Sequence, residues 1–200
     1  MMLPNFKYEQ ASGHAIVCGI DEAGRGPWAG PVCAAAVILD HPHIPAGLND
    51  SKKLTEAKRE KLYPEILRAA EVGVGLVSAA EIDVINILQA TYLAMNRAVA
   101  ALKSKPSLAL IDGNRAPKLF CATQTINGGD GKSLSIAAAS IIAKVTRDRL
   151  MIEIDAIYPA YGFARHKGYG TAAHAAALAK HGPCTEHRKS FAPIWALLNR

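Results

Sequence analysis

Residues 15–39, AIVCGIDEAGRGPWAGPVCAAAVIL, contain two short apolar runs joined by a connection rich in glycine and proline. The first run ends in two acids and predicts a buried strand over residues 15–21. The second run predicts another strand over residues 32–39. The connection is too irregular for a helix and suits a turn or a short hairpin. The chain therefore opens with elements of a sheet.

Further along the chain, short apolar runs alternate with segments of helical spacing. We expect three more strands, over residues 72–77, 108–112 and 120–126. Helical spacing predicts helices over residues 55–70 (with Thr55 as N-cap), 86–102, 133–157, 171–181 and 191–199. The small residues of SIAAASIIAKV (135–145) predict close packing of one helix against the sheet. This order indicates an α/β domain with a mixed sheet, followed by a helical lobe over about residues 158–200.

The composition is that of one soluble globular domain: 200 residues, of which 50% are hydrophobic and 20% are charged. No apolar run approaches the roughly 20 residues of a membrane span, and residues 1–10 lack the pattern of a secretory signal. We therefore expect a cytoplasmic protein without a membrane partner, and, in the absence of a dimerisation signal, a monomer. The four cysteines form no Cys-x-x-Cys pair and predict reduced, mostly buried thiols.

The chain is basic, with a net charge of +6, which favours an acidic partner such as nucleic acid. The excess is concentrated in residues 144–200, which hold nine Lys or Arg, four Asp or Glu, and four of the seven histidines. A basic surface that only keeps the protein soluble is the alternative interpretation.

Several acids stand at or near the ends of predicted strands. Asp21 and Glu22 follow one strand, and because neighbouring side chains on a strand point to opposite faces, one of them would be buried. A buried carboxylate needs a cation, an arginine or a break in the strand. Asp112 ends another strand, although Asp112-Gly113 could be a plain turn. Asp130 precedes a predicted helix, where it could simply be a turn or N-cap residue.

Carboxylates without histidine or cysteine ligands nearby favour hard ions such as Mg²⁺ or Mn²⁺ over Zn²⁺. Two such ions can activate a water and stabilise the leaving oxygen in phosphodiester cleavage. Together with a basic surface, the acids therefore indicate a nuclease. A dinucleotide-binding loop, a P-loop and a His-Glu-x-x-His zinc site are excluded, because the glycine and histidine spacings do not fit.

The chain resembles type 2 ribonucleases H, and the bacterial ribonuclease HII branch in particular. The resemblance runs through nearly the whole chain in the family's order. It rests on GIDEAGRGP (19–27), LNDSKKL (48–54), LIDGN (110–114), residues 135–145 and YGFARHKGY (161–169). It implies a ribonuclease H-like fold with a mixed five-stranded sheet flanked by helices, and a single catalytic domain over residues 1–200 with a C-terminal helical region.

The resemblance also implies a site of four carboxylates that bind two divalent ions, Mg²⁺ or Mn²⁺. Asp21, Glu22 and Asp112 match its first three positions. We assign the fourth to Asp130. Asp148 is the competitor, but Lys144 and Asp148 form an ordinary i,i+4 ion pair on the predicted helix.

Substrate recognition is assigned by the same resemblance. Gly24, Arg25 and Gly26 would recognise a ribonucleotide 2′-OH through backbone groups, and glycine allows the close approach. Tyr169 would lie against the sugar of the following nucleotide; Tyr161 is an alternative that could simply be packing.

The remaining candidates are phosphate contacts and less certain positions. We expect phosphate contacts from Lys52, Lys53, His166, Lys167 and Arg188. Ser51 and Ser190 could also donate hydrogen bonds to phosphate, and Trp28 could contact substrate or only fill the turn.

The resemblance implies an endonuclease that hydrolyses the RNA strand of RNA/DNA hybrids. It would also cut 5′ of single ribonucleotides in duplex DNA, leaving 3′-OH and 5′-phosphate ends. A non-catalytic nucleic-acid-binding module is the alternative class. It accounts for the basic C-terminal part, but not for acids at strand ends, which would repel phosphate unless metal is bound.

Overall fold

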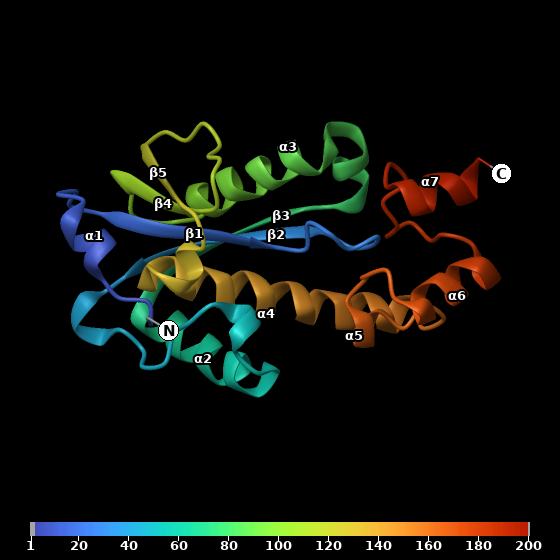
Figure 1. Ribbon diagram of the computed structural model, residues 1–200, viewed down its shortest axis with the longest axis horizontal. Helices are drawn as coiled ribbons and strands as arrows, with labels where there is room; N and C mark the ends of the chain where they lie inside the picture. The colour runs from blue at the N-terminus through green and yellow to red at the C-terminus, as the bar shows by residue number, and fades with distance from the viewer. Residues whose placement is uncertain (1–2, 200) are drawn as a thin grey trace.

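A computed structural model describes residues 3–199 and shows a five-stranded sheet covered by helices on both faces (Figure 1). The order across the sheet is β3-β2-β1-β4-β5. β1 pairs antiparallel with β2, and β2 with β3, whereas β1, β4 and β5 run parallel to one another. The predicted α/β fold with a mixed sheet is confirmed. The strands are β1 (Val17–Ala23), β2 (Val32–Leu39), β3 (Ala70–Val77), β4 (Leu108–Asp112) and β5 (Ala122–Ile126).

All five predicted helices are present, with ends shifted by a few residues except at the start of the second. Thr55 is the N-cap of its helix, as predicted, and its side chain accepts a hydrogen bond from the Lys58 amide. Two short helices and three 3₁₀ turns were not predicted, because elements of three to five residues have too little periodicity to detect. The helices are α1 (Lys7–Ala11), α2 (Glu56–Ala69), α3 (Ala79–Ala100), α4 (Leu134–Ile157), α5 (Phe163–His166), α6 (Ala172–His181) and α7 (Ala192–Leu198), and the 3₁₀ turns are η1 (His41–His43), η2 (Ser51–Lys53) and η3 (Gly129–Gly131).

Helix α3 begins before the predicted start at residue 86. Its N-terminus is a capping box in which Ser78 and Glu81 satisfy each other's backbone amides. Asn86, with φ of +65°, then interrupts the helix, and its side chain accepts hydrogen bonds from the amides of Leu88 and Gln89. Sequence periodicity therefore found only the segment after this internal cap.

The two faces of the sheet have separate apolar cores. α3 packs on one face against Ala34 and Ala36 of β2, while α4 and α2 pack on the other against Cys33 and Ala35 (Figure 1). This alternation is the period of two that a strand buried on both faces requires.

The predicted close packing of α4 on the sheet is confirmed at Gly19 of β1. A Cβ added to Gly19 would lie 2.2 Å from the backbone carbon of Ser135, so only glycine allows this approach. The N-terminus of α4 is thereby held next to the strand that carries Asp21.

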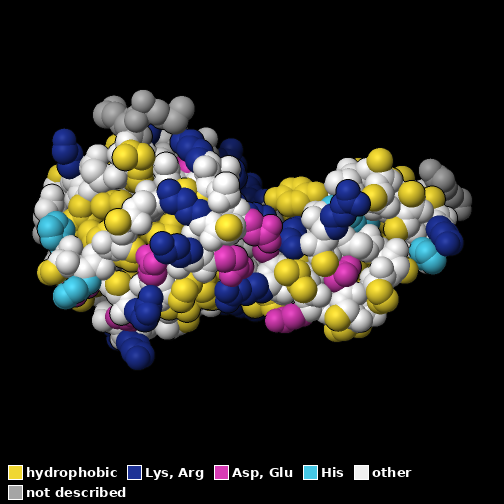
Figure 2. Space-filling model, turned by 90° about the horizontal axis from the view of Figure 1, so that it is seen from below, with side chains coloured by type: hydrophobic (Ala, Val, Ile, Leu, Met, Phe, Trp, Pro, Cys, Tyr) yellow, Lys and Arg dark blue, Asp and Glu magenta, His cyan; other side chains and the backbone are white. Residues whose placement is uncertain are grey.

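Helices α5, α6 and α7 lie beyond one end of the sheet, and α4 extends from the sheet to reach them (Figure 1). We use "lobe" for residues 158–199. The lobe shares an apolar cluster with Ala29 and Met151, built on Phe163, Leu178 and Ile194. In the space-filling view the molecule narrows between the sheet and the lobe, and acidic and basic side chains gather there (Figure 2). Within residues 3–199, no helix has both the length and the apolar character needed to cross a membrane.

The packing at Gly19 gives a stability prediction. Gly19→Ala should lower the free energy of unfolding by about 2–3 kcal/mol, because the new methyl group overlaps the α4 backbone. Gly26→Ala is the matched control, since its Cβ would meet only the Tyr169 ring at 3.9 Å. Urea unfolding of both variants checks this, and equal stability of the two would contradict the packing argument.

Candidate active site

Three carboxylates from separate segments meet at one edge of the sheet. Asp21 on β1 and Asp112 on β4 lie side by side, because these strands run parallel with Ile20 opposite Ile111. Asp130 comes from η3, which follows β5. One oxygen of each carboxylate lies within 4.8 Å of the other two. This is the carboxyl end of parallel strands, where ligands of open α/β sheets gather.

Glu22 lies on the opposite face of β1 from this group of three. Asp21 is paired with Ala35, on the α4 side, whereas Glu22 is paired with Ala34, on the α3 side. The Glu22 carboxylate lies 3.4 Å from Arg25 Nη1 and borders a cleft lined by α3 residues. The structure therefore brings together three of the four predicted carboxylates and places the fourth beside them, across the strand.

The electrostatics of the three carboxylates favour the binding of a positive charge. Burial raises the pKa of Asp21 well above its usual range, and the neighbouring Glu22 and Asp112 raise it further. Burial and the charge of Asp112 raise the pKa of Asp130 to about 6. Partial burial lowers the pKa of Lys52, but Asp21 and Asp130 outweigh this effect and raise it overall. Three carboxylates in this arrangement fit a hard divalent cation.

The loop that carries Asp130 is held from two sides. Asp112 Oδ1 accepts a hydrogen bond of 2.6 Å from the Gly129 amide, which fixes η3 against β4. On the other side, Glu9 of α1 is buried, and its Oε1 accepts hydrogen bonds from the hydroxyls of Ser133 and Ser135 and from the Ser135 amide.

Sequence reasoning missed Glu9. Ser133 caps the Ile136 amide, but residue 136 is isoleucine and cannot complete a capping box, so the Ser135 amide and the two serine hydroxyls take their acceptor from a distant segment. Nothing in the sequence identified which acid it would be.

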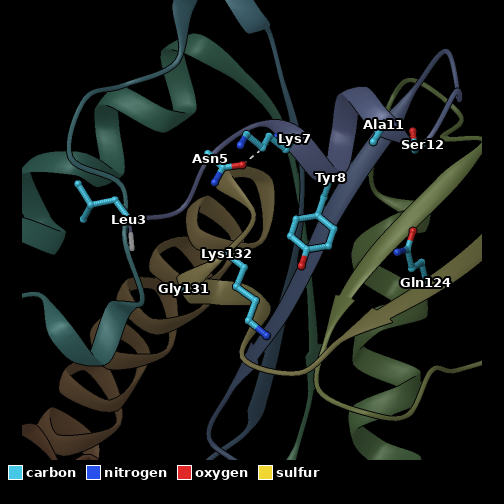
Figure 3. Close-up of a pocket in the computed structure, with 9 residues that line it drawn as sticks. All are labelled: Leu3, Asn5, Lys7, Tyr8, Ala11, Ser12, Gln124, Gly131 and Lys132. Atoms are coloured by element: carbon cyan, nitrogen blue, oxygen red, sulfur yellow. Dashed lines mark hydrogen bonds between the residues drawn. The ribbon is translucent and has the colours of Figure 1, made fainter. Parts of the chain in front are cut away.

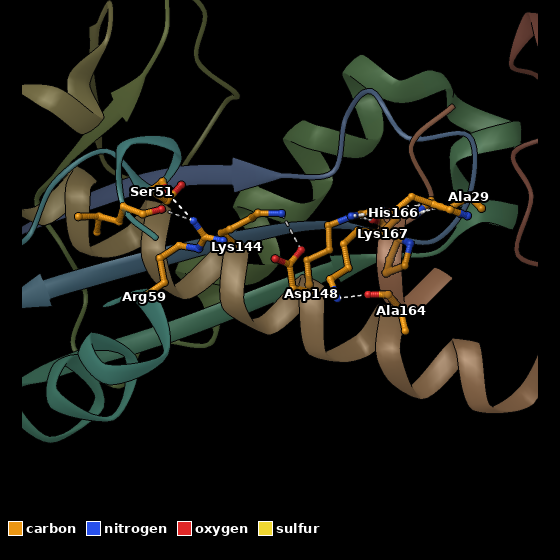
Figure 4. A network of polar contacts seen from close by, with 12 residues as sticks. Ala29, Ser51, Arg59, Lys144, Asp148, Ala164, His166 and Lys167 are labelled. Atoms are coloured by element: carbon orange, nitrogen blue, oxygen red, sulfur yellow. Dashed lines mark hydrogen bonds and ion pairs between the residues drawn. The ribbon is translucent and has the colours of Figure 1, made fainter. Parts of the chain in front are cut away.

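Asp148, the alternative fourth carboxylate, lies outside the group of three. Lys144 Nζ lies 2.7 Å from Asp148 Oδ1, which is the predicted i,i+4 ion pair on α4 (Figure 4). This position agrees with the choice of Asp130.

The glycine-rich turn of residues 24–26 lies directly beside Asp21. Gly24 has φ of +94°, and a Cβ at this position would lie 2.0 Å from Arg147 Nε. Both the backbone conformation and the close contact therefore require glycine at residue 24. The cleft next to it has a volume of about 200 Å³ and is lined by Asp21, Glu22, the turn, Ser51, Lys52, Lys144, Arg147 and Tyr169.

Two buried arginines support the turn from beneath. Arg188 is fully buried, and its guanidinium donates to the carbonyls of Gly24, Arg25 and Gly30. Arg147 donates to the carbonyls of Ala29, Pro31 and Lys167. The expected phosphate contact by Arg188 does not fit this position, because none of its side chain is exposed. Sequence alone could not separate an exposed arginine from a buried one.

The other basic and hydroxyl candidates occupy varied positions. Lys52 lines the cleft, and Lys53 is exposed on η2, whereas Ser51 is buried. His166 is half-buried, with Nε2 bonded to the Tyr161 carbonyl and Nδ1 bonded to the Gly168 amide. The Lys167 ammonium donates to the Ala164 carbonyl (Figure 4).

The aromatic candidates separate clearly. Tyr169 is 46% exposed, and its ring borders the cleft beside Gly26. Tyr161 is buried, and its hydroxyl donates to the Gly182 carbonyl, which supports the packing interpretation. Trp28 packs against Gly170 and His174 of the lobe, and the Ser190 hydroxyl donates to Asp83.

A larger cavity, of about 580 Å³, lies elsewhere (Figure 3). It is lined by residues of α1 and its flanks, by Gln124, and by Gly131 and Lys132. None of the clustered carboxylates lines it, so the chemistry is assigned to the smaller cleft.

Comparison with known proteins agrees with this site. The family model described as Ribonuclease HII matches residues 18–196. The chain belongs to the ribonuclease HII family. It is 56% identical to a ribonuclease HII of Parvibaculum lavamentivorans over 99% of this chain and 75% of that protein. It is 54% identical to a ribonuclease HII of Jannaschia sp. over 98% of this chain and 99% of that one.

Solved structures show the same fold. The ribonuclease H2 of Pyrococcus horikoshii superposes with a TM-score of 0.77 and 27% identity, covering 92% of this chain and 98% of that one. Membership of the ribonuclease HII family makes the chain an endoribonuclease and implies dependence on a divalent metal. The alternative of a non-catalytic binding module is therefore wrong.

The raised pKa of Asp130 predicts how the metal-free protein responds to substitution. In EDTA at pH 7.5, Asp130→Asn should raise the free energy of unfolding by about 1–2 kcal/mol, because it removes a penalised negative charge. The penalty exists only where the carboxyl is ionised, so the gain should shrink as pH falls through 6 towards 4. Mg²⁺ should stabilise the unsubstituted protein more than the variant.

Asp148→Asn is the control for this measurement. It removes the ion pair with Lys144 and should give no gain in EDTA. Destabilisation of the metal-free protein by Asp130→Asn would contradict the electrostatic argument.

The Glu9 contacts predict a separate effect on stability. Glu9→Ala should cost about 2–3 kcal/mol, because it leaves buried Ser133 and Ser135 donors without their acceptor. Glu153→Ala, an exposed position on α4, should change stability by less than about 0.5 kcal/mol. Urea unfolding of the two variants tests this, and a similar small cost for both would show that the Glu9 contacts contribute little.

Proposed function

We propose that the chain hydrolyses the RNA strand of RNA/DNA hybrids and cuts on the 5′ side of single ribonucleotides in duplex DNA. The products would be 3′-OH and 5′-phosphate ends. One observation carries this proposal: the group of Asp21, Asp112 and Asp130 lies beside a backbone turn that glycine keeps open.

Asp21, Asp112 and Asp130, with Glu22 from across the strand, would hold two divalent ions, Mg²⁺ or Mn²⁺. When bound, these ions supply the charge that activates the attacking water and stabilises the leaving 3′ oxygen. The protein's contribution is a fixed set of hard oxygen ligands, held by the strand pairing of β1 with β4 and by the Gly129–Asp112 hydrogen bond.

The turn would recognise the ribonucleotide through its amides. Arg188 occupies the carbonyls of Gly24 and Arg25, so the turn offers N–H groups to the cleft. An N–H group can donate to the oxygen of a 2′-OH, which is the group that separates RNA from DNA. The exposed Tyr169 ring, close to Gly26, would lie against the next sugar.

Lysines at the edge of the cleft would bind the phosphate backbone. Lys52 and Lys144 line the cleft. Lys53 and Lys167 are close in sequence to the cleft residues Lys52 and Tyr169, and both are at least partly exposed. In this proposal residues 3–199 act as one catalytic domain: the sheet supplies the carboxylates and the lobe supplies Tyr169.

The decisive experiment is cleavage of a labelled DNA duplex that carries one ribonucleotide, in Mg²⁺, Mn²⁺ or EDTA. We expect a metal-dependent cut only 5′ of the ribonucleotide, and no cut in an all-DNA duplex. Asp112→Asn and Asp130→Asn should lower kcat by at least about a hundredfold, because each removes a carboxylate that would hold a divalent ion at the reacting phosphate.

Asp148→Asn is the matched control, because it is the same substitution on a neighbouring element but outside the carboxylate group. It should retain kcat within about threefold. Unchanged rates in Asp112→Asn, or a large loss in Asp148→Asn with activity kept in Asp130→Asn, would refute the assignment.

A further inference from the structure

Three histidines lie together in the core of the lobe and have no part in the chemistry described above. His174 and His187 are 0% and 1% exposed, and their Nε2 atoms are 3.0 Å apart. The His166 ring stacks on His174 with centroids 4.5 Å apart. Each nitrogen of a buried histidine ring needs a hydrogen-bond partner. Whether that partner donates or accepts then shows which ring nitrogen carries the proton.

The proton positions follow from backbone groups at each end of the pair. His174 Nδ1 lies 3.0 Å from the Tyr169 carbonyl, which can only accept, so this nitrogen carries a proton. His187 Nδ1 lies 2.9 Å from the Cys184 amide, which can only donate, so this nitrogen carries none. In neutral rings, His187 Nε2–H must then donate to the bare Nε2 of His174. One directed chain of hydrogen bonds runs from Cys184 through both rings to Tyr169.

The pair cannot accept a proton without losing a bond. A proton added to His174 would face His187 Nε2–H, and one added to His187 would face the Cys184 amide. The groups packed against the pair are Trp28, Tyr161, Phe163, His166 and the Cys184 thiol, and no carboxylate, lysine or arginine is among them. Burial lowers the pKa of His174, and burial together with His174 lowers the pKa of His187 to about 4, so both rings are neutral at pH 7.

This series of hydrogen bonds links Tyr169, at the substrate cleft, to the loop that follows the 24–26 turn. Tyr169, whose carbonyl receives the last hydrogen bond, presents its ring to the cleft. At the other end, His187 forms a β-bridge with Ala29, and the residues beside it, Glu186 and Arg188, are hydrogen-bonded to Gly30 and Trp28. The histidines therefore span the gap between Tyr169 and the loop that contains the 24–26 turn.

We propose that His174 and His187 are positioning residues, a neutral pair of fixed tautomers that sets Tyr169 at its distance from the 24–26 turn. This inference rests on the proposed function, in which Tyr169 and the turn hold the two sugars that flank the cut.

The tautomers can be measured without any assay of activity. Long-range ¹H–¹⁵N NMR of the histidine rings at pH 7.5 should show His174 as the Nδ1–H tautomer and His187 as the Nε2–H tautomer. His166 should be Nε2–H, because its Nδ1 accepts from the Gly168 amide. A charged ring, or the opposite tautomer at His174, would overturn the inference.

Kinetics test whether the pair acts on the substrate. His174→Leu should lower kcat/KM on the single-ribonucleotide duplex about tenfold, because it removes one of the two hydrogen bonds that hold the Tyr169 carbonyl, the other coming from the Thr171 amide. His174→Asn, whose amide can still donate to the Tyr169 carbonyl, should recover most of this loss. Phe163→Leu, which packs on the same histidines without a hydrogen bond to them, should lose stability but keep kcat/KM within about twofold. Equal kinetic losses in Phe163→Leu and His174→Leu would show a merely structural role and overturn the inference.

A double-substitution cycle separates this inference from the proposed function. In a Tyr169→Ala background, His174→Leu should cause no further loss of kcat/KM, because its effect passes through Tyr169. A fully additive loss would overturn the positioning role and leave the proposed function intact. Wild-type kcat/KM in Tyr169→Ala alone would instead remove Tyr169 from the substrate site, and with it the role proposed for the pair.

Discussion

The mutual repulsion of carboxylates that lie close together at the ends of two neighbouring parallel strands is the constraint on which the rest of the site depends. Asp21 and Asp112 are fixed by the pairing of β1 with β4, and Asp130 is drawn in by the hydrogen bond from Gly129 to Asp112. Such an arrangement is unfavourable without a cation, and the raised pKa values of Asp21 and Asp130 express that cost. The close carboxylates lower the stability of the metal-free protein but form a rigid set of oxygen ligands, as expected at a metal-dependent active site.

The shape of the 24–26 turn depends on buried positive charges. Arg147 and Arg188 are buried and bonded to backbone carbonyls, so their charges are satisfied by dipoles and not by acids. Each guanidinium spans several carbonyls of the connection between β1 and β2, which gives an irregular loop a fixed shape. Arg188 comes from the lobe and Arg147 from α4, so the turn is built by segments more than a hundred residues away along the chain.

The residues that differed from expectation share a cause. Arg188 was expected at the surface because arginine usually is exposed, yet its neighbours in space, the carbonyls of residues 24–30, cannot be read from the sequence around it. Glu22 borders the same cleft as Asp21, although the alternation of a strand directs the two side chains to opposite faces, a placement that only the pairing of β1 with β2 reveals. Glu9 was missed because it satisfies a helix terminus that lies more than a hundred residues downstream.

The sequence by itself determined the α/β class, all five strands, the five longer helices and the identity of the acids, because these follow from local periodicity and from the motifs of one family. It also favoured Asp130 over Asp148, since the spacing of Lys144 and Asp148 on a helix already predicted their ion pair. Only the tertiary structure decided which acids meet, which arginines are buried, and which nitrogen of His174 and of His187 carries the proton. Those outcomes depend on which backbone donors and acceptors lie next to each side chain in the folded protein. A buried polar group must have such partners, but when the partners are distant along the chain the sequence does not identify them.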